Sequence, residues 1–136
     1  MKWKAEFMIG IEAIDRQHRQ IFEHLLAIEN SIEKGDPWNV MSYLITQLGD
    51  CLKLHFAVEE ALLEIIDYPE SRDHCAAHAR LCTAIVKLES SIRKSNSATD
   101  LVTFFEQWFI RHVLGDDRRY AEYAKNHLPK RHPAKI

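Results

Sequence analysis

Residues 14–32 read IDRQHRQIFEHLLAIENSI, and the positions of the apolar residues in this stretch decide the fold class. They recur at alternating intervals of four and three residues, which keeps side chains on one face of an α-helix. The apolar positions are Ile14, Ile21, Leu25, Ile28 and Ile32, and His18 occupies the remaining position of the same face. The stretch is followed by Gly35-Asp36-Pro37, a sequence typical of a helix end and a new helix start. An amphipathic helix ending near Gly35 is therefore predicted.

Three more stretches show the same helical spacing. They run over residues 44–66, 74–92 and 101–112, with short breaks near residues 67–69 and 95–97. Gly115 and the charged cluster behind it are expected to close the last helix. Short connections place consecutive helices antiparallel. The sequence therefore predicts an all-α protein, an up-down-up-down antiparallel four-helix bundle over about residues 12–115 of a single domain (1–136), with a short C-terminal extension at 116–136.

Composition limits the classes of function. The chain has 136 residues and a formal net charge of −2, which argues against nucleic-acid binding through a basic surface. No segment has the length or apolarity of a membrane span or a signal peptide, so no membrane insertion is expected. Its three cysteines form no C-x-x-C motif and no even set, as is typical of a reducing compartment. A cytoplasmic protein is expected.

Polar residues occupy core positions of all four predicted helices. They are His18, His55, Glu59, His74, His78 and His112. A single buried histidine is common and is usually hydrogen-bonded within the core. Burying six such groups without partners would cost roughly 1–3 kcal/mol each. Their shared position on the core-facing stripes therefore indicates a site at which they meet.

The same residues also share a level along the bundle. His18 lies near the start of the first helix, and His55 and Glu59 lie near the end of the second. His74 and His78 begin the third, and His112 ends the fourth. In an up-down-up-down bundle these ends lie together, within roughly two turns at about 1.5 Å per residue. Helical phase and level thus indicate one location.

The donor types indicate a metal. His74 and His78 are four residues apart, as are His55 and Glu59, so each pair lies on one helical face. Five imidazoles and at least one carboxylate are more ligands than one tetrahedral zinc ion binds. The cysteines also lack the close spacing that structural zinc sites require. Imidazole with carboxylate suits iron. Repeated Glu-x-x-His, typical of carboxylate-rich di-iron bundles, does not occur, so a histidine-rich pair of irons is favoured.

Several motifs together resemble one family. They are Gly10-Ile11, Ile14-Asp15-Arg16-Gln17-His18, His55-Phe56-Ala57-Val58-Glu59-Glu60, His74-Cys75-Ala76-Ala77-His78, and Trp108-Phe109-Ile110-Arg111-His112 followed by Asp117 and Tyr120. In this combination the chain resembles the hemerythrins, particularly the single-domain bacterial ones, from Trp3 through Tyr120. The resemblance implies two non-haem irons and reversible dioxygen binding.

The resemblance also assigns roles to matching positions. It implies that His74, His78 and His112 hold one iron, that His18 and His55 hold the other, and that Glu59 and Asp117 bridge the pair beside an oxo or hydroxo oxygen from solvent. Dioxygen would bind at the iron with two histidines. The implied function is oxygen storage or delivery to oxygen-consuming enzymes. The alternative is an oxygen- or redox-sensing domain with a signalling partner, and an enzymatic role is ranked below both.

A few positions remain open at the level of sequence. Asp116, four residues after His112, is the residue that helical periodicity selects, whereas the resemblance selects Asp117. Glu60 is expected to be an exposed residue on the flank of the second helix. Tyr120 is expected to hydrogen-bond near the site. Phe109 stands where relatives often carry leucine, which bears on oxygen affinity.

Overall fold

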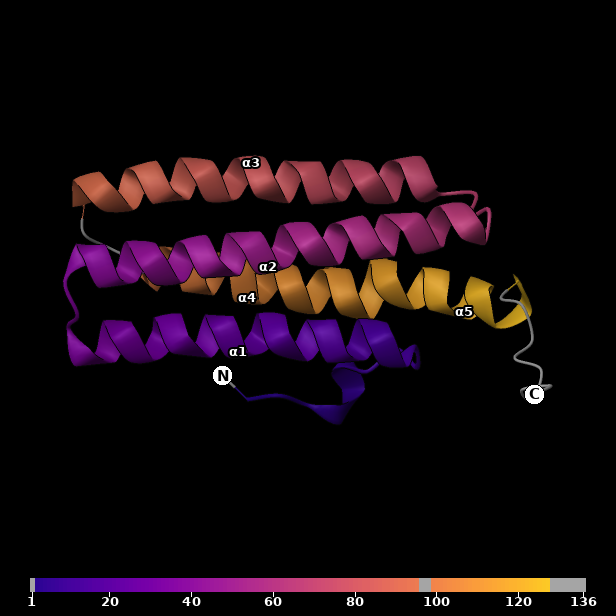
Figure 1. Cartoon of the computed structure of the whole chain (residues 1–136), viewed down its shortest axis with the longest axis horizontal. Coiled ribbons are helices and arrows are strands. Elements are labelled where there is room, and N and C mark those ends of the chain that lie inside the picture. The colour runs from indigo at the N-terminus through magenta and orange to yellow at the C-terminus, as the bar shows by residue number, and fades with distance from the viewer. Residues whose placement is uncertain (1, 96–98, 128–136) are drawn as a thin grey trace, which may run out of the picture.

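The computed structural model describes residues 2–95 and 99–127, which contain helices and no strand. Four long helices lie side by side and each runs opposite to the one before it (Figure 1). They are α1 (Glu12–Lys34), α2 (Trp38–Ile65), α3 (Ser71–Ser95) and α4 (Thr99–Arg111). The predicted all-α, up-down-up-down bundle is confirmed. Residues 96–98 of the third predicted connection and residues 128–136 of the C-terminal extension lie outside the described residues.

Glycine and proline set the turn between α1 and α2, as the sequence predicts. Gly35 ends α1 with φ 68°, a left-handed conformation that glycine adopts without steric cost. The Gly35 and Asp36 amides donate hydrogen bonds to the carbonyls of Ile32 and Ser31, at 3.0 and 3.1 Å. Pro37, which has no amide hydrogen to leave unpaired, immediately precedes α2. This turn makes α1 and α2 antiparallel neighbours.

The N-terminal segment folds back against one end of the bundle. It contains a short 3₁₀ helix, η1 (Ala5–Phe7), and the Phe7 ring packs edge-on against Phe109 at 5.9 Å. Asp15 ties the segment to α1, since its carboxylate accepts hydrogen bonds from the amides of Ile9 (2.7 Å) and Gly10 (3.1 Å). Those contacts place an aromatic cover at the end of the bundle where the histidines lie.

The core is apolar toward the α1–α2 turn and polar toward the opposite end. Leu25 and Ile28 of α1 are fully buried, and Leu48 of α2 is 1% exposed. Beyond them the same stripes continue into buried histidines and carboxylates. None of the described helices has both the length and the apolarity that crossing a bilayer would need.

The prediction that Gly115 ends the fourth helix is wrong. The helical path continues from α4 through a π-helical segment, η2 (His112–Asp117), into α5 (Arg118–His127). Gly115 lies inside η2 and lacks the positive φ that marks Gly35 as a helix end. Tyr120, Ala121 and Ala124 are buried, so packing against the bundle holds the continued helix in place.

Candidate metal centre

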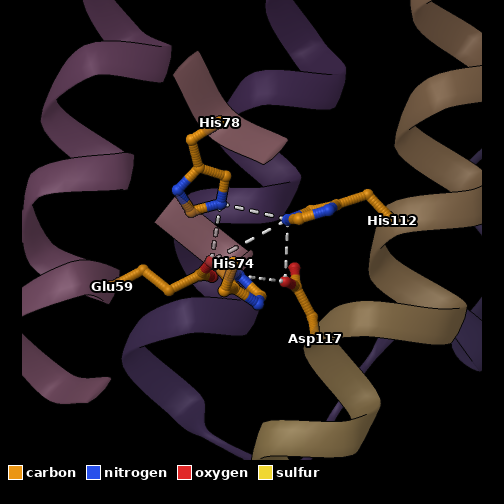
Figure 2. A group of neighbouring side chains, drawn as sticks. All are labelled: Glu59, His74, His78, His112 and Asp117. Carbon is orange, nitrogen blue, oxygen red and sulfur yellow. Dashed lines mark hydrogen bonds and ion pairs between the residues drawn. The ribbon is translucent and has the colours of Figure 1, made fainter. Parts of the chain in front are cut away.

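The structure brings all seven predicted ligand residues into one buried cluster. Glu59 and Asp117 have no exposed surface, and each of the five histidines is at most 5% exposed. His18 comes from α1, His55 and Glu59 from α2, His74 and His78 from α3, and His112 and Asp117 from η2. Figure 2 shows five of them around a common centre. The five histidines and Glu59 therefore lie together, as their helical phase and level predict, and Asp117 lies with them, as the resemblance predicts.

Glu59 occupies the centre of the cluster. Its Oε1 lies 2.6 Å from the Nε2 atom of His74 and 3.0 Å from that of His78. Its Oε2 lies 3.2 Å from the Nε2 atom of His55. Tyr120, as expected from the sequence, donates a hydrogen bond of 3.0 Å to the same Oε2. One carboxylate thus contacts an imidazole of its own helix, α2, and two imidazoles of α3.

Asp117 faces Glu59 across the cluster (Figure 2). Its Oδ1 lies 3.0 Å from the Nε2 atom of His112 and 3.1 Å from that of His74, while its Oδ2 lies 3.0 Å from the Nε2 atom of His18. In a π-helix the backbone hydrogen bonds span five residues instead of four, so each turn holds more residues than an α-helical turn. The π-helix η2 therefore carries Asp117, five residues after His112, back onto the face that His112 occupies.

The cluster divides into two groups that share both carboxylates. One group holds Glu59, His74, His78, His112 and Asp117, and the other holds His18, His55, Glu59 and Asp117. Within each group, one ligand atom from every residue lies within 4.8 Å of the others. Both Glu59 and Asp117 direct one oxygen to each group. Each of the two carboxylates is thus shared between the two groups.

Three histidines are oriented by acceptors at their outer nitrogens. The Nδ1 atom of His55 lies 2.8 Å from the Gln17 amide oxygen. The Nδ1 atoms of His78 and His112 lie 3.0 and 2.9 Å from the carboxylates of Glu60 and Asp116. Because these oxygens only accept hydrogen bonds, each Nδ1 carries a proton and each Nε2 is the nitrogen that faces the centre, where it offers a lone pair once deprotonated.

Sequence reasoning missed these outer acceptors. Glu60, expected to be exposed, is only 37% exposed at its side chain because it lies against His78. Asp116, the residue that periodicity selects as a ligand, contacts the outer nitrogen of His112 instead of the centre. Gln17 and Glu60 directly precede or follow a predicted ligand in the sequence, and that adjacency is the one signal that could have identified them.

Inward-facing lone pairs make the cluster suited to cations. Neutral Nε2 atoms and carboxylate oxygens both present lone pairs, and contacts of 2.6–3.2 Å between them are repulsive unless a proton or metal ion lies between. The two Asp117 oxygens are buried and accept no hydrogen bond from any described residue. The donor set of imidazole nitrogen and carboxylate oxygen suits non-haem iron.

Aromatic side chains enclose the cluster. Phe56 stacks on the His78 ring at 3.8 Å, and Trp108 stacks on the His112 ring at 4.3 Å. Phe109 packs edge-on against His18 at 5.7 Å, on the side of the cluster that holds two histidines. The aromatic shell fixes ring orientations and keeps bulk water away from the centre.

Two carboxylates favour the protonated forms of His74 and His112 when no metal is bound. Burial alone would lower the pKa values of His74 and His112, but Asp117 and Glu59 raise them to about 9 and about 10. Burial would raise the pKa of Glu59, and the surrounding histidines hold it well below its usual range. Protonated His74 and His112 therefore stabilise the two buried carboxylates when no metal is bound.

We expect the metal-free protein to lose stability as the pH rises. The folded pKa values of His74 (about 9) and His112 (about 10) exceed the ordinary 6.5, so their stabilising protonation is complete below pH 6.5 and is lost as the pH rises through 9 to 10. Metal binding requires deprotonated ligands, so the metal-bound protein should keep its stability over this range. Thermal denaturation of chelator-treated and iron-loaded protein measures the difference, and a constant gap between their midpoints would contradict the expectation.

Four antiparallel helices around a buried histidine–carboxylate cluster define a helix-bundle protein of the non-haem metal class. Comparison with known protein families identifies the family within this class. Residues 9–124 match the family described as the hemerythrin HHE cation binding domain. The chain belongs to the hemerythrin family.

Relatives in three organisms illustrate the match. A bacteriohemerythrin of Stenotrophomonas maltophilia is 34% identical over 134 residues, covering 93% of this chain and 82% of that protein. A bacteriohemerythrin of Clostridium acetobutylicum is 32% identical over 88% of this chain and 98% of that protein. A hemerythrin-like protein of Naegleria gruberi is 20% identical over 87% of this chain and 88% of that protein. The resemblance identified from sequence motifs is confirmed.

Proposed function

We propose that this chain binds two non-haem irons and uses them to bind dioxygen reversibly, for oxygen storage or delivery. The observation that carries the proposal is the division of the Glu59 and Asp117 oxygens between two histidine groups. His74, His78 and His112 would hold one iron, and His18 and His55 the other. Glu59 and Asp117 would bridge the pair. Membership of the hemerythrin family supports iron as the metal.

Unequal donor numbers in the two groups support binding of a small ligand. Beside the two shared carboxylates, one group supplies three imidazoles and the other only two. The group with two imidazoles therefore leaves more of its metal's coordination positions to an external ligand. Two reduced irons held by these residues would supply the two electrons that reversible binding of dioxygen requires.

The chain's own residues would keep this exchange reversible. Phe7 and Phe109 cover the side of the cluster with two histidines, which limits the entry of water and the loss of reactive oxygen species. Tyr120, whose pKa is raised by burial and by Glu59, keeps its proton and its hydrogen bond to the Glu59 carboxylate. That bond fixes the orientation of a carboxylate shared by both groups.

Absorption spectra of the reduced, iron-loaded protein test the proposal. We expect a new visible band when dioxygen is added under otherwise anaerobic conditions, and loss of that band when dioxygen is removed. The cycle should repeat with little loss of amplitude, and iron analysis should give two irons per chain. A single iron per chain would contradict the paired site.

The absorption spectra, together with an assay of peroxide consumption, distinguish oxygen storage from a sensing role and from an enzyme. Irreversible conversion to an oxidised spectrum on the first exposure would contradict oxygen storage and favour a sensing role. Repeated consumption of hydrogen peroxide by catalytic amounts of the loaded protein would favour an enzyme.

A further inference from the structure

The outer face of α2 carries a row of exposed apolar side chains. Leu54 is 68% exposed, Val58 37% and Ile65 71%, and Ala61 between them is also exposed. We call these four residues the α2 stripe. Their spacing of four, three and four residues aligns them along one side of the helix. In Figure 1, α2 lies in the foreground with α4 behind it, and no other element crosses its near side.

The α2 stripe is additional to the face that packs into the bundle. The inner face of α2 contains Leu52, His55, Glu59 and Leu63, all buried. Five of the seven large apolar side chains that are exposed in the described residues belong to α2; besides three members of the stripe they include Val40 and Tyr43. A helix that is apolar on two opposite sides is typical of one that packs against something on each side.

Opposite charges lie at the two ends of the stripe. Lys53 lies beside its first residue and Glu64 beside its last, eleven residues later. Eleven residues are about three helical turns, so both charges lie on the same flank of the stripe. Both side chains are exposed, and neither forms an ion pair with a residue that the structure describes. The charge pattern therefore has a direction along the helix.

We propose that the α2 stripe is the interface of a homodimer, in which two copies pack antiparallel about a two-fold axis. Antiparallel packing puts Leu54 of one copy opposite Ile65 of the other, and Val58 opposite Ala61. It also brings Lys53 of each copy within one turn of Glu64 of the other, which forms two equivalent ion pairs. Parallel packing would instead put the two Lys53 side chains on opposite flanks of the interface, at the end away from both Glu64 side chains, so neither ion pair would form.

A second copy suits this surface because the pattern complements itself. A two-fold axis perpendicular to the helices makes one patch meet the identical patch in reverse direction, which is the closed geometry of most homodimers. Apolar residues then cover apolar residues and each end charge meets its opposite. The inner face of α2, with the histidines and Glu59, is untouched by this contact.

Analytical ultracentrifugation of the full-length, iron-loaded chain tests the dimer. We expect reversible, concentration-dependent dimerisation of the unchanged protein. Leu54→Glu should raise the dimer dissociation constant by about tenfold or more, because an apolar contact of the interface, made twice by the two-fold axis, becomes a buried charge. Val86→Glu is the matched control, since Val86 is 65% exposed on α3 and lies outside the stripe. Circular dichroism and iron content should be unchanged in both variants.

Charge exchange tests the antiparallel arrangement. Lys53→Glu and Glu64→Lys should each weaken the dimer, because each single variant places like charges together. The double variant Lys53→Glu/Glu64→Lys restores both pairs and should dimerise nearly as well as the original protein. A chain that is monomeric at every accessible concentration would overturn the proposal. Equal effects of Leu54→Glu and Val86→Glu, or failure of the double variant to recover, would also overturn it.

Discussion

Glu59→Gln should remove most of the iron from the protein, leaving less than one iron per chain. Glu59 is fully buried and its two oxygens contact both histidine groups. The substitution keeps the shape of the side chain but removes its negative charge, so each iron would lose an anionic ligand and the pair would lose a bridge. The visible band formed with dioxygen should disappear as well. Iron analysis after anaerobic reconstitution and desalting measures the loss.

Glu60→Gln is the matched control for this prediction. It makes the same chemical change one residue away, at a carboxylate that contacts the outer Nδ1 atom of His78. Loss of such an outer partner typically weakens metal affinity by about 10- to 100-fold without removing a ligand. With iron in excess, Glu60→Gln should therefore still bind two irons per chain. If Glu59→Gln also keeps two irons, Glu59 is not a bridging ligand.

Much of this architecture could be predicted because helical periodicity is regular. The four-and-three spacing of residues 14–32 gives the direction in which each side chain of α1 points, and His18 shares that direction with Leu25 and Ile28. Short turns such as the one at Gly35 fix the alternation of helix directions. Together they place the polar ends of four helices at one level, and the buried cluster lies there.

Departures from regular periodicity could not be predicted in the same way. The extra residue in the π-helical turn of η2 changes the direction in which the following side chains point. Regular α-helical spacing of four residues from His112 therefore selects Asp116 and not Asp117. The structure gives the two aspartates different contacts, with Asp117 at the centre and Asp116 at the outer nitrogen of His112. Tyr120 and Ala121 just after the turn are buried against the bundle, and a local sequence pattern does not record such tertiary packing.

Asp117→Asn should therefore remove metal far more severely than Asp116→Asn, although the two residues are adjacent and the chemical change is the same. Both Asp117 oxygens are buried, lie 3.0–3.1 Å from histidine nitrogens of three helical segments, and accept no hydrogen bond from a described residue. An amide there would lose the charge that joins the two cations. It would also turn N–H hydrogens toward some of the inward-facing nitrogens. We expect less than one iron per chain and no reversible band with dioxygen.

Asp116→Asn preserves an oxygen that can accept the hydrogen bond from His112 Nδ1, and Asp116 is 40% exposed at its side chain. It should keep two irons per chain when iron is in excess, with affinity reduced by at most about 10- to 100-fold. Iron content and dioxygen-dependent spectra of the two variants, measured side by side, separate a π-helical from an α-helical register in solution. A regular α-helix through residues 112–117 would reverse the result, with Asp116→Asn losing the metal. Equal iron content in the two variants would contradict a ligand role for Asp117, because only Asp117, and not Asp116, lies at the centre of the cluster.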